Sequence, residues 1–270
     1  MLVENKFFFV SLPRGASTAF KEACILSRYD IKHVNSYYDF IYENNKVFQN
    51  QTYFPPTDNN VVNNKITNEK VEINTMNFGY KYSIFHPHER LIHLLNKFGD
   101  NYPIISIKRN KFHRFVSIFS KIVELLYQSN DFISYDILSK INYKDLFCFE
   151  SKLIIEEKYE LIADIVFDNL KLNKNNIVYI KELLQLLFKP MSHWHGNNDK
   201  IIWFDLENIE SMQNLENWVS DITKKKFVLH KSNNIKEPIS HLLKVDKEFR
   251  WLFDNYYTQT ENQKNIKTII

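Results

Sequence analysis

One segment near the amino end combines residue types that can bind a phosphate group. This segment, Arg14–Thr18, follows an apolar run, Phe7–Val10, after three intervening residues. The apolar run has strong strand preference and is too short for a helix. Gly15 permits a tight turn, and Ser17 or Thr18 can cap a helix that begins there. A helix that opens after a strand aims free N–H groups and the positive end of its dipole at one place. Together with the charge of the arginine, this pattern predicts a phosphate site.

A second pair of residues can grip one dianionic phosphate. Arg109 follows the apolar stretch 104–107 after one lysine, and Ser117 lies eight residues further on. An arginine at the carboxyl end of a strand offers a planar fork of donors, and a serine two turns into the next helix offers a hydroxyl. Taken alone, an arginine in this position is usually a surface charge.

A third group is the pair of histidines in His86-Pro87-His88. Side chains two residues apart on extended chain point to the same side, and Pro87 keeps His86 out of helical geometry. Histidine is suited to taking a proton from a hydroxyl near neutral pH. The alternatives are a surface pair or a partial metal site, and no cysteine or carboxylate at metal-ligand spacing supports zinc.

The first segment resembles the loop with which sulfotransferases hold the 5′-phosphosulfate of their donor, 3′-phosphoadenosine 5′-phosphosulfate (PAPS). Residues 13–20 read Pro-Arg-Gly-Ala-Ser-Thr-Ala-Phe and are similar to the Pro-Lys-x-Ala-Ser-Thr-x-Phe form of heparan sulfate 2-O-sulfotransferases. The segment is not a Walker A loop, which needs a second glycine followed by lysine. The resemblance implies that the donor is bound by Arg14, Gly15, Ala16, Ser17, Thr18 and Ala19.

The other two groups match the same family in the same order along the chain. In sulfotransferases an arginine and a serine at this spacing hold the 3′-phosphate of the donor, which implies this role for Arg109 and Ser117. The family usually continues Arg-Asp-Pro, whereas this chain continues Asn110-Lys111. The 2-O-sulfotransferases carry His-Gly-His in the place of the histidine pair. This match makes His88 the general base and His86 an assisting or acceptor-contacting residue.

Three weaker signals lie in the carboxyl-terminal half. Lys231 sits where these enzymes place a basic loop over the nucleotide, so it is a candidate for the 3′-phosphate, and a solvated lysine is the alternative. Ser192–His195 and the strand after it resemble a segment of the wider carbohydrate sulfotransferase group with a mostly structural role. In this segment, His193 and His195 are further candidates for contact with the acceptor, ranked below His86 and His88. The run Lys224–Lys226 is interpreted as a solvated face.

Strands that alternate with helices predict an α/β fold with a mainly parallel central sheet covered by helices on both faces. We expect one domain over 1–270, in which the asparagine-rich residues 43–77 form an irregular insertion or flap. The resemblance adds a three-layer, P-loop-kinase-like sulfotransferase fold. The expected helices are 17–28, 89–98, 111–127, three within 131–189, 209–222 and 238–257, and the expected strands are 7–10, 31–34, 78–85, 102–108 and 200–206.

Composition limits the class of protein. A net charge of +3 over 270 residues suits an anionic ligand in a local cleft better than a surface that coats nucleic acid. Two cysteines, Cys24 and Cys148, provide no disulfide framework and fit a reducing compartment. No apolar run reaches the roughly 18 residues of a membrane span, and no signal peptide is evident, so we expect a soluble cytoplasmic protein. Four glycines and abundant Asn, Lys, Ile and Tyr are typical of an AT-rich genome, bacterial or viral.

The sequence therefore predicts a metal-independent enzyme that moves a sulfuryl group from PAPS to an acceptor hydroxyl and releases 3′,5′-ADP (PAP). The histidine pair favours a glycan acceptor over a tyrosine or a small alcohol. One alternative is a P-loop-type nucleotide or small-molecule kinase, which the missing Gly-Lys and the lack of a clear magnesium-binding aspartate near a strand end disfavour. The other is a non-catalytic binder of sulfated glycan or nucleic acid.

Overall fold

The computed structural model divides the chain into two compact units, residues 1–109 with 190–234 and residues 110–189 with 235–270. The residues that it describes are 1–13, 15–32, 39–43, 46–50, 58–64, 69–75, 89–127, 143–149, 152–169, 177–196, 198–229 and 243–255. The predicted strand 78–85 lies outside them.

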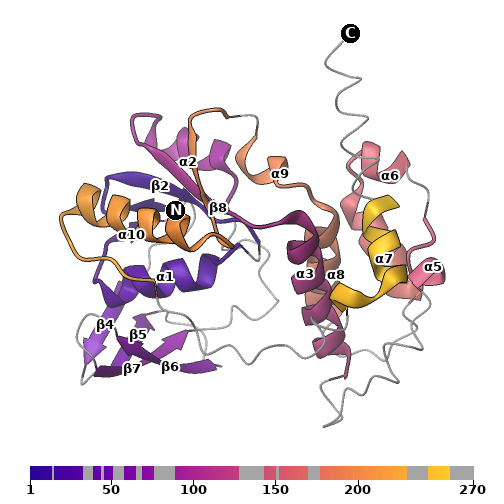
Figure 1. The fold of residues 1–270 in the computed structure, drawn as a ribbon, viewed down its shortest axis with the longest axis horizontal. Coiled ribbons are helices and arrows are strands. Elements are labelled where there is room, and N and C mark those ends of the chain that lie inside the picture. The colour runs from indigo at the N-terminus through magenta and orange to yellow at the C-terminus, as the bar shows by residue number, and fades with distance from the viewer. Residues whose placement is uncertain are drawn as a thin grey trace. The chain divides into compact units, whose positions relative to one another are not determined.

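The first unit contains a mixed five-stranded sheet in the order β3-β1-β2-β8-β9 (Figure 1). Its central strands β2, β8 and β9 are parallel neighbours, and β1 pairs antiparallel with β2 and β3. The sheet and its flanking helices confirm the predicted α/β class. The strands are β1 (Leu2–Val3), β2 (Phe7–Val10), β3 (Ile31–Lys32), β8 (Ile104–Lys108) and β9 (Ile201–Asp205).

Helices pack on both faces of this sheet. On one face α1 (Ser17–Leu26) and α10 (Ile209–Thr223) bury their apolar sides against β2, β8 and β9 in a single hydrophobic cluster. In that cluster the rings of Phe9 and Phe20 stack with centroids 3.9 Å apart. On the other face Phe8 packs against Phe98 of α2 (Leu91–Phe98), and the short helix α9 (Ser192–His195) adjoins α2. The alternation of β2 side chains between two buried faces explains its unbroken apolar sequence.

A second sheet corrects the expectation of irregular structure over 43–77. Its strands are β4 (Asp39–Glu43), β5 (Lys46–Asn50), β6 (Asp58–Asn64) and β7 (Glu69–Thr75), in the order β4-β5-β7-β6. β6 pairs with β7 along its whole length, antiparallel, so Val62 faces Val71. Asparagine is depleted in strands, and pairing between separate segments leaves little trace in local composition. For that reason the sequence pattern missed this sheet.

The second unit is helical in its described part. Its helices are α3 (Lys111–Tyr127), α5 (Tyr143–Leu146), α6 (Lys152–Ile155), α7 (Tyr159–Asn169) and α8 (Ile177–Phe188), with residues 243–245 and 247–255 also helical. The structure thus has four helices in the described part of 131–189, where the sequence predicted three. The predicted helix 238–257 is interrupted at Asp246, whose Oδ1 accepts a hydrogen bond from the N–H of Phe249 (2.9 Å) and so starts a new helix.

A buried arginine holds two helices of this unit together. Arg114 of α3 is 2% exposed, and its Nη2 donates to the carbonyls of Leu186 (2.9 Å) and Lys189 (3.3 Å) at the carboxyl end of α8. The negative end of the α8 dipole compensates the guanidinium charge, and the arginine satisfies carbonyls that lack an intrahelical partner.

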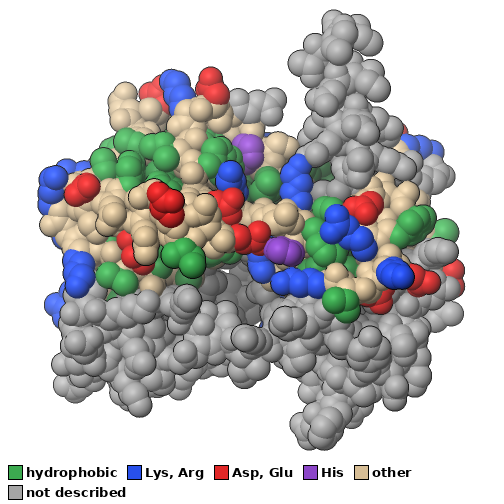
Figure 2. Space-filling model, viewed as in Figure 1, with side chains coloured by type: hydrophobic (Ala, Val, Ile, Leu, Met, Phe, Trp, Pro, Cys, Tyr) green, Lys and Arg blue, Asp and Glu red, His purple; other side chains and the backbone are tan. Residues whose placement is uncertain are grey.

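None of the described helices has both the length and the apolar character needed to cross a bilayer. On the face shown in Figure 2, acidic and basic side chains are interspersed among hydrophobic ones over the described surface.

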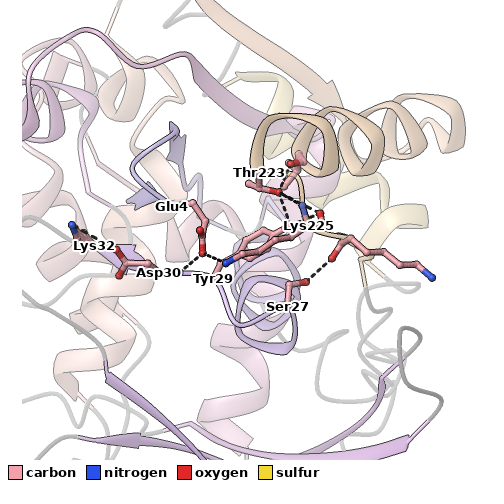
Figure 3. A network of polar contacts seen from close by, with 9 residues as sticks. Glu4, Ser27, Tyr29, Asp30, Lys32, Thr223 and Lys225 are labelled. Carbon is pink, nitrogen blue, oxygen red and sulfur yellow. Dashed lines mark hydrogen bonds and ion pairs between the residues drawn. The ribbon is translucent and has the colours of Figure 1, made fainter.

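A polar network ties the carboxyl end of α10 to the segment after α1 (Figure 3). The Tyr29 hydroxyl lies 2.9 Å from the Thr223 hydroxyl and donates to the Lys225 carbonyl at 2.9 Å. Lys225 Nζ lies 2.8 Å from Oε1 of Glu4, which also accepts from the Asp30 N–H. Burial raises the pKa of Tyr29 to about 12, so its hydroxyl stays protonated as a donor. The network fixes the chain just before residue 230.

Replacing Tyr29 by phenylalanine should destabilise the protein by about 1 kcal/mol, because the buried Thr223 hydroxyl and the partly buried Lys225 carbonyl both lose a hydrogen-bond partner. Urea denaturation followed by circular dichroism measures this loss. Ser27→Ala is the control, because it removes one exposed bond from Ser27 Oγ to the Lys226 carbonyl (3.2 Å) in the same region. Equal stability of the Tyr29→Phe variant and the wild type would contradict the assigned role.

Candidate functional site

The carboxyl ends of three parallel strands meet at one edge of the five-stranded sheet. β2 pairs in parallel with β8, and β8 with β9, so the residues that follow Val10, Lys108 and Asp205 leave the sheet on the same side. α1 and α10 both begin beyond this edge. In open α/β sheets, ligands bind outside the carboxyl ends of the strands. This edge is therefore the candidate site.

The turn between β2 and α1 lies directly against the end of β8. The Gly15 N–H donates to the Leu12 carbonyl (3.0 Å), which closes the turn. A Cβ atom on Gly15 would lie 3.0 Å from the carbonyl oxygen of Ile107 and 3.2 Å from that of Leu12. A side chain at this position would therefore need the two carbonyl groups to move by a few tenths of an ångström. This contact brings the amino end of α1 close to the strand that leads into Arg109.

The start of α1 differs from the sequence expectation. Its N-cap is Ala16, in the left-handed region (φ 59°, ψ 22°), and no side chain caps it, so Ser17 and Thr18 are the first helical residues and not the cap. The first helical bond runs from the Phe20 N–H to the Ala16 carbonyl (3.0 Å). The N–H groups of the first turn, residues 17–19, have no intrahelical acceptor.

The left-handed backbone conformation of Ala16 costs free energy of folding, and strained residues of this kind are typical of binding sites. An L-residue in the left-handed region is less stable by about 1–2 kcal/mol. Such strain concentrates at functional sites, and left-handed residues next to a helix start form concave sets of N–H groups that bind anions. Because the Gly15 N–H is occupied within the turn, Gly15 contributes through its shape, whereas the amides after it supply the donors.

Arg109 lies at the same edge, next to an acidic partner. Its Nε is 3.9 Å from Oε1 of Glu207, with the two side chains 25% and 37% exposed. The Leu206 N–H donates to the Lys108 carbonyl (2.9 Å) and so extends the β8–β9 pairing beyond the strands. This backbone bond places Arg109 and Glu207 side by side.

Asp205, at the end of β9, is engaged in the same turn. Its Oδ1 accepts from the Glu207 N–H (3.0 Å), and its own N–H donates to the Ser211 hydroxyl (2.7 Å). Asn208 caps α10 by accepting from the Ser211 N–H (3.0 Å). Unlike α1, α10 therefore begins with its cap formed by a side chain.

Several predicted site residues are not placed at this edge. Arg14, His86, His88 and Lys231 lie outside the described residues, as does the side chain of Thr18. Ser117 is buried in α3, 7% exposed, in the second unit, whereas Arg109 belongs to the first. The pairing of Arg109 with Ser117 and the roles of the histidines stay predictions.

The histidines of α9 make packing contacts. The carbonyl of His193 accepts from Arg90 Nε (3.0 Å), and the ring of His195 packs edge-on against Trp203 with centroids 4.9 Å apart. Burial lowers the pKa of His195, which favours its neutral form. In the run Lys224–Lys226 all three residues are exposed, in line with the predicted solvated face.

Sequence inspection missed a buried carboxyl group in α1 and a half-buried lysine beside it. Glu22 is 2% exposed, its Oε2 has no hydrogen-bond partner within the described chain, and burial raises its pKa to about 7. Burial also lowers the pKa of the neighbouring Lys21 to about 8. Both lie within two turns of the candidate site. The available signal was that α1 carries charges on a helix whose other residues are mostly apolar.

In the described part of the chain, no three or more His, Cys, Asp or Glu side chains are grouped so that they could hold a metal ion. Comparisons of this chain with protein-family models, with curated proteins and with solved structures found no match.

Gly15→Ala should destabilise the protein by about 1–3 kcal/mol, because the added methyl group cannot fit against the Ile107 carbonyl. Urea denaturation measures the loss. Gly99→Ala is the comparison: nothing lies within 4 Å of its added Cβ, so its cost comes from the backbone conformation alone (φ 82°, ψ 178°), which is nearly confined to glycine and costs other residues about 1–3 kcal/mol. A Gly15→Ala variant as stable as the wild type would show that the turn does not press on β8.

Glu22→Gln should raise stability in a pH-dependent way. The folded-state pKa of about 7 exceeds the ordinary value of 4.5, so the unfolded chain ionises first and wild-type stability falls as pH rises between these values. The variant should gain little at pH 4.5 and about 3 kcal/mol near pH 8. Denaturation at a series of pH values measures the difference, with Glu210→Gln, an exposed site, as control. A gain that does not grow with pH would contradict the burial of this carboxyl group.

Proposed function

We propose that this protein is a sulfotransferase that moves a sulfuryl group from PAPS to a glycan hydroxyl. One observation carries the proposal: the turn before α1 contacts the end of β8, so the predicted phosphosulfate loop and Arg109 lie at one sheet edge. A donor with phosphate groups at two ends needs two anion sites within one nucleotide's length. The proposal includes a P-loop-kinase-like sulfotransferase fold.

In this proposal the two ends of the donor are held by different groups. The amides at the start of α1 and the side chain of Arg14 bind the 5′-phosphosulfate. Arg109, together with Ser117 and Lys231, binds the 3′-phosphate. Arginine keeps its proton, so Arg14 stabilises the departing phosphate by charge and does not protonate it. A proton donor is scarcely needed there because the leaving phosphate is already a stable anion.

Transfer proceeds by in-line displacement. His88 takes the proton of the acceptor hydroxyl, with His86 assisting, while the acceptor oxygen forms a bond to sulfur. The bond between sulfur and the bridging 5′-phosphate oxygen breaks, and its electron pair leaves with PAP. Negative charge grows on that phosphate, where preorganised donors contribute about 3 kcal/mol each. The mechanism requires no metal ion.

Calorimetric titration with 3′,5′-ADP separates this function from its alternatives. A sulfotransferase should bind 3′,5′-ADP well without magnesium, a kinase should prefer ATP with magnesium, and a non-catalytic glycan or nucleic-acid binder should ignore both. Incubation with radiolabelled PAPS and a panel of glycans, proteins and small alcohols then identifies the acceptor.

Two substitutions should separate donor binding from chemistry. Arg109→Ala should weaken 3′,5′-ADP binding at least tenfold, since a charge-assisted bond to phosphate contributes about 1.5–3 kcal/mol. His88→Ala should abolish transfer and leave donor affinity almost unchanged. Lys108→Ala, an exposed cation next to Arg109, is the control for the loss of charge. Loss of donor affinity in the histidine variant would mean that the histidine binds the donor and is not the base.

A further inference from the structure

We infer that Glu207 competes with phosphate for Arg109: it holds the guanidinium at the sheet edge when the site is empty and yields it to a phosphate dianion. The inference rests on the proposed function, since it concerns the anion that Arg109 binds. The observation behind it is the Arg109–Glu207 contact, which the sequence did not predict.

Backbone hydrogen bonds fix the positions of the Arg109 and Glu207 main chains. β8 and β9 are paired in register up to Lys108 and Asp205, and the Leu206 N–H donates to the Lys108 carbonyl one step beyond. The Glu207 N–H is in turn bound by the Asp205 carboxylate. The backbone of Glu207 is therefore held beside Arg109 by the strand pairing and the turn after it.

The contact is close enough to attract and too long to bind tightly. Nε and Oε1 are 3.9 Å apart, beyond the 2.7–3.2 Å of an N–H···O hydrogen bond, and both side chains are partly exposed. A phosphate dianion offers twice the charge and can accept two parallel bonds from the guanidinium. The dianion should therefore displace the carboxylate, whereas weaker anions should not.

Removal of the competing charge gives a measurable prediction. Glu207→Gln should tighten the binding of 3′,5′-ADP about threefold, the effect typical of an exposed ion pair. Glu210→Gln, which removes an exposed charge one position into α10, should change the affinity less. Glu207→Asp, which keeps the charge, should stay close to the wild type.

Calorimetric titrations of the full chain with 3′,5′-ADP and, separately, with inorganic phosphate test the inference. The gain from Glu207→Gln must vanish in the Arg109→Ala background, because the competition acts through that guanidinium. Unchanged or weaker binding in Glu207→Gln, or the same gain without Arg109, overturns the inference.

The two ligands distinguish failure of the inference from failure of the proposed function. If the wild type does not bind 3′,5′-ADP, the proposed function fails, and the phosphate titration decides the inference alone. Tighter phosphate binding by Glu207→Gln that depends on Arg109 then supports it. Absence of phosphate binding by both proteins overturns it.

Discussion

The contact of the Gly15 turn with the end of β8 is the constraint on which the candidate site depends. It arises because β2 and β8 are parallel neighbours, so the loops after them leave the same edge. With no side chain at Gly15, the turn can lie within van der Waals distance of the Ile107 carbonyl, and α1 starts there without a side-chain cap. The start of α1 and the strand that leads into Arg109 thus lie at the same edge of the sheet.

The same edge shows how the first unit distributes charge. The strained start of α1 leaves amide donors uncapped, whereas the start of α10 is closed by Asn208 and surrounded by Asp205, Glu207 and Glu210. One helix start therefore favours anions, and the acidic residues around the other repel them. Under the proposed function, Arg109 can pair either with Glu207 or with a bound phosphate, and these two anions compete for its guanidinium group.

Two buried charged residues, Arg114 and Glu22, are accommodated in different ways. Arg114 is satisfied by carbonyls at the end of α8, so it contributes to the packing of α3 on α8. Glu22 is buried without a hydrogen bond to Oε2 in the described chain, and it avoids the cost by binding a proton, which is why its pKa rises. A group of that kind weakens a fold at alkaline pH, and natural chains tend to keep such groups near functional sites.

The sequence by itself determined the α/β class, the strand Phe7–Val10 and the helix over 111–127. These follow from local periodicity, strand preference and glycine or proline boundaries, which are properties of consecutive residues. Only the tertiary structure decided the second sheet within 39–75, the left-handed cap at Ala16, the raised pKa of Glu22 and the approach of Glu207 to Arg109. Each of these depends on which distant segment packs alongside, and neither composition nor spacing carries that information.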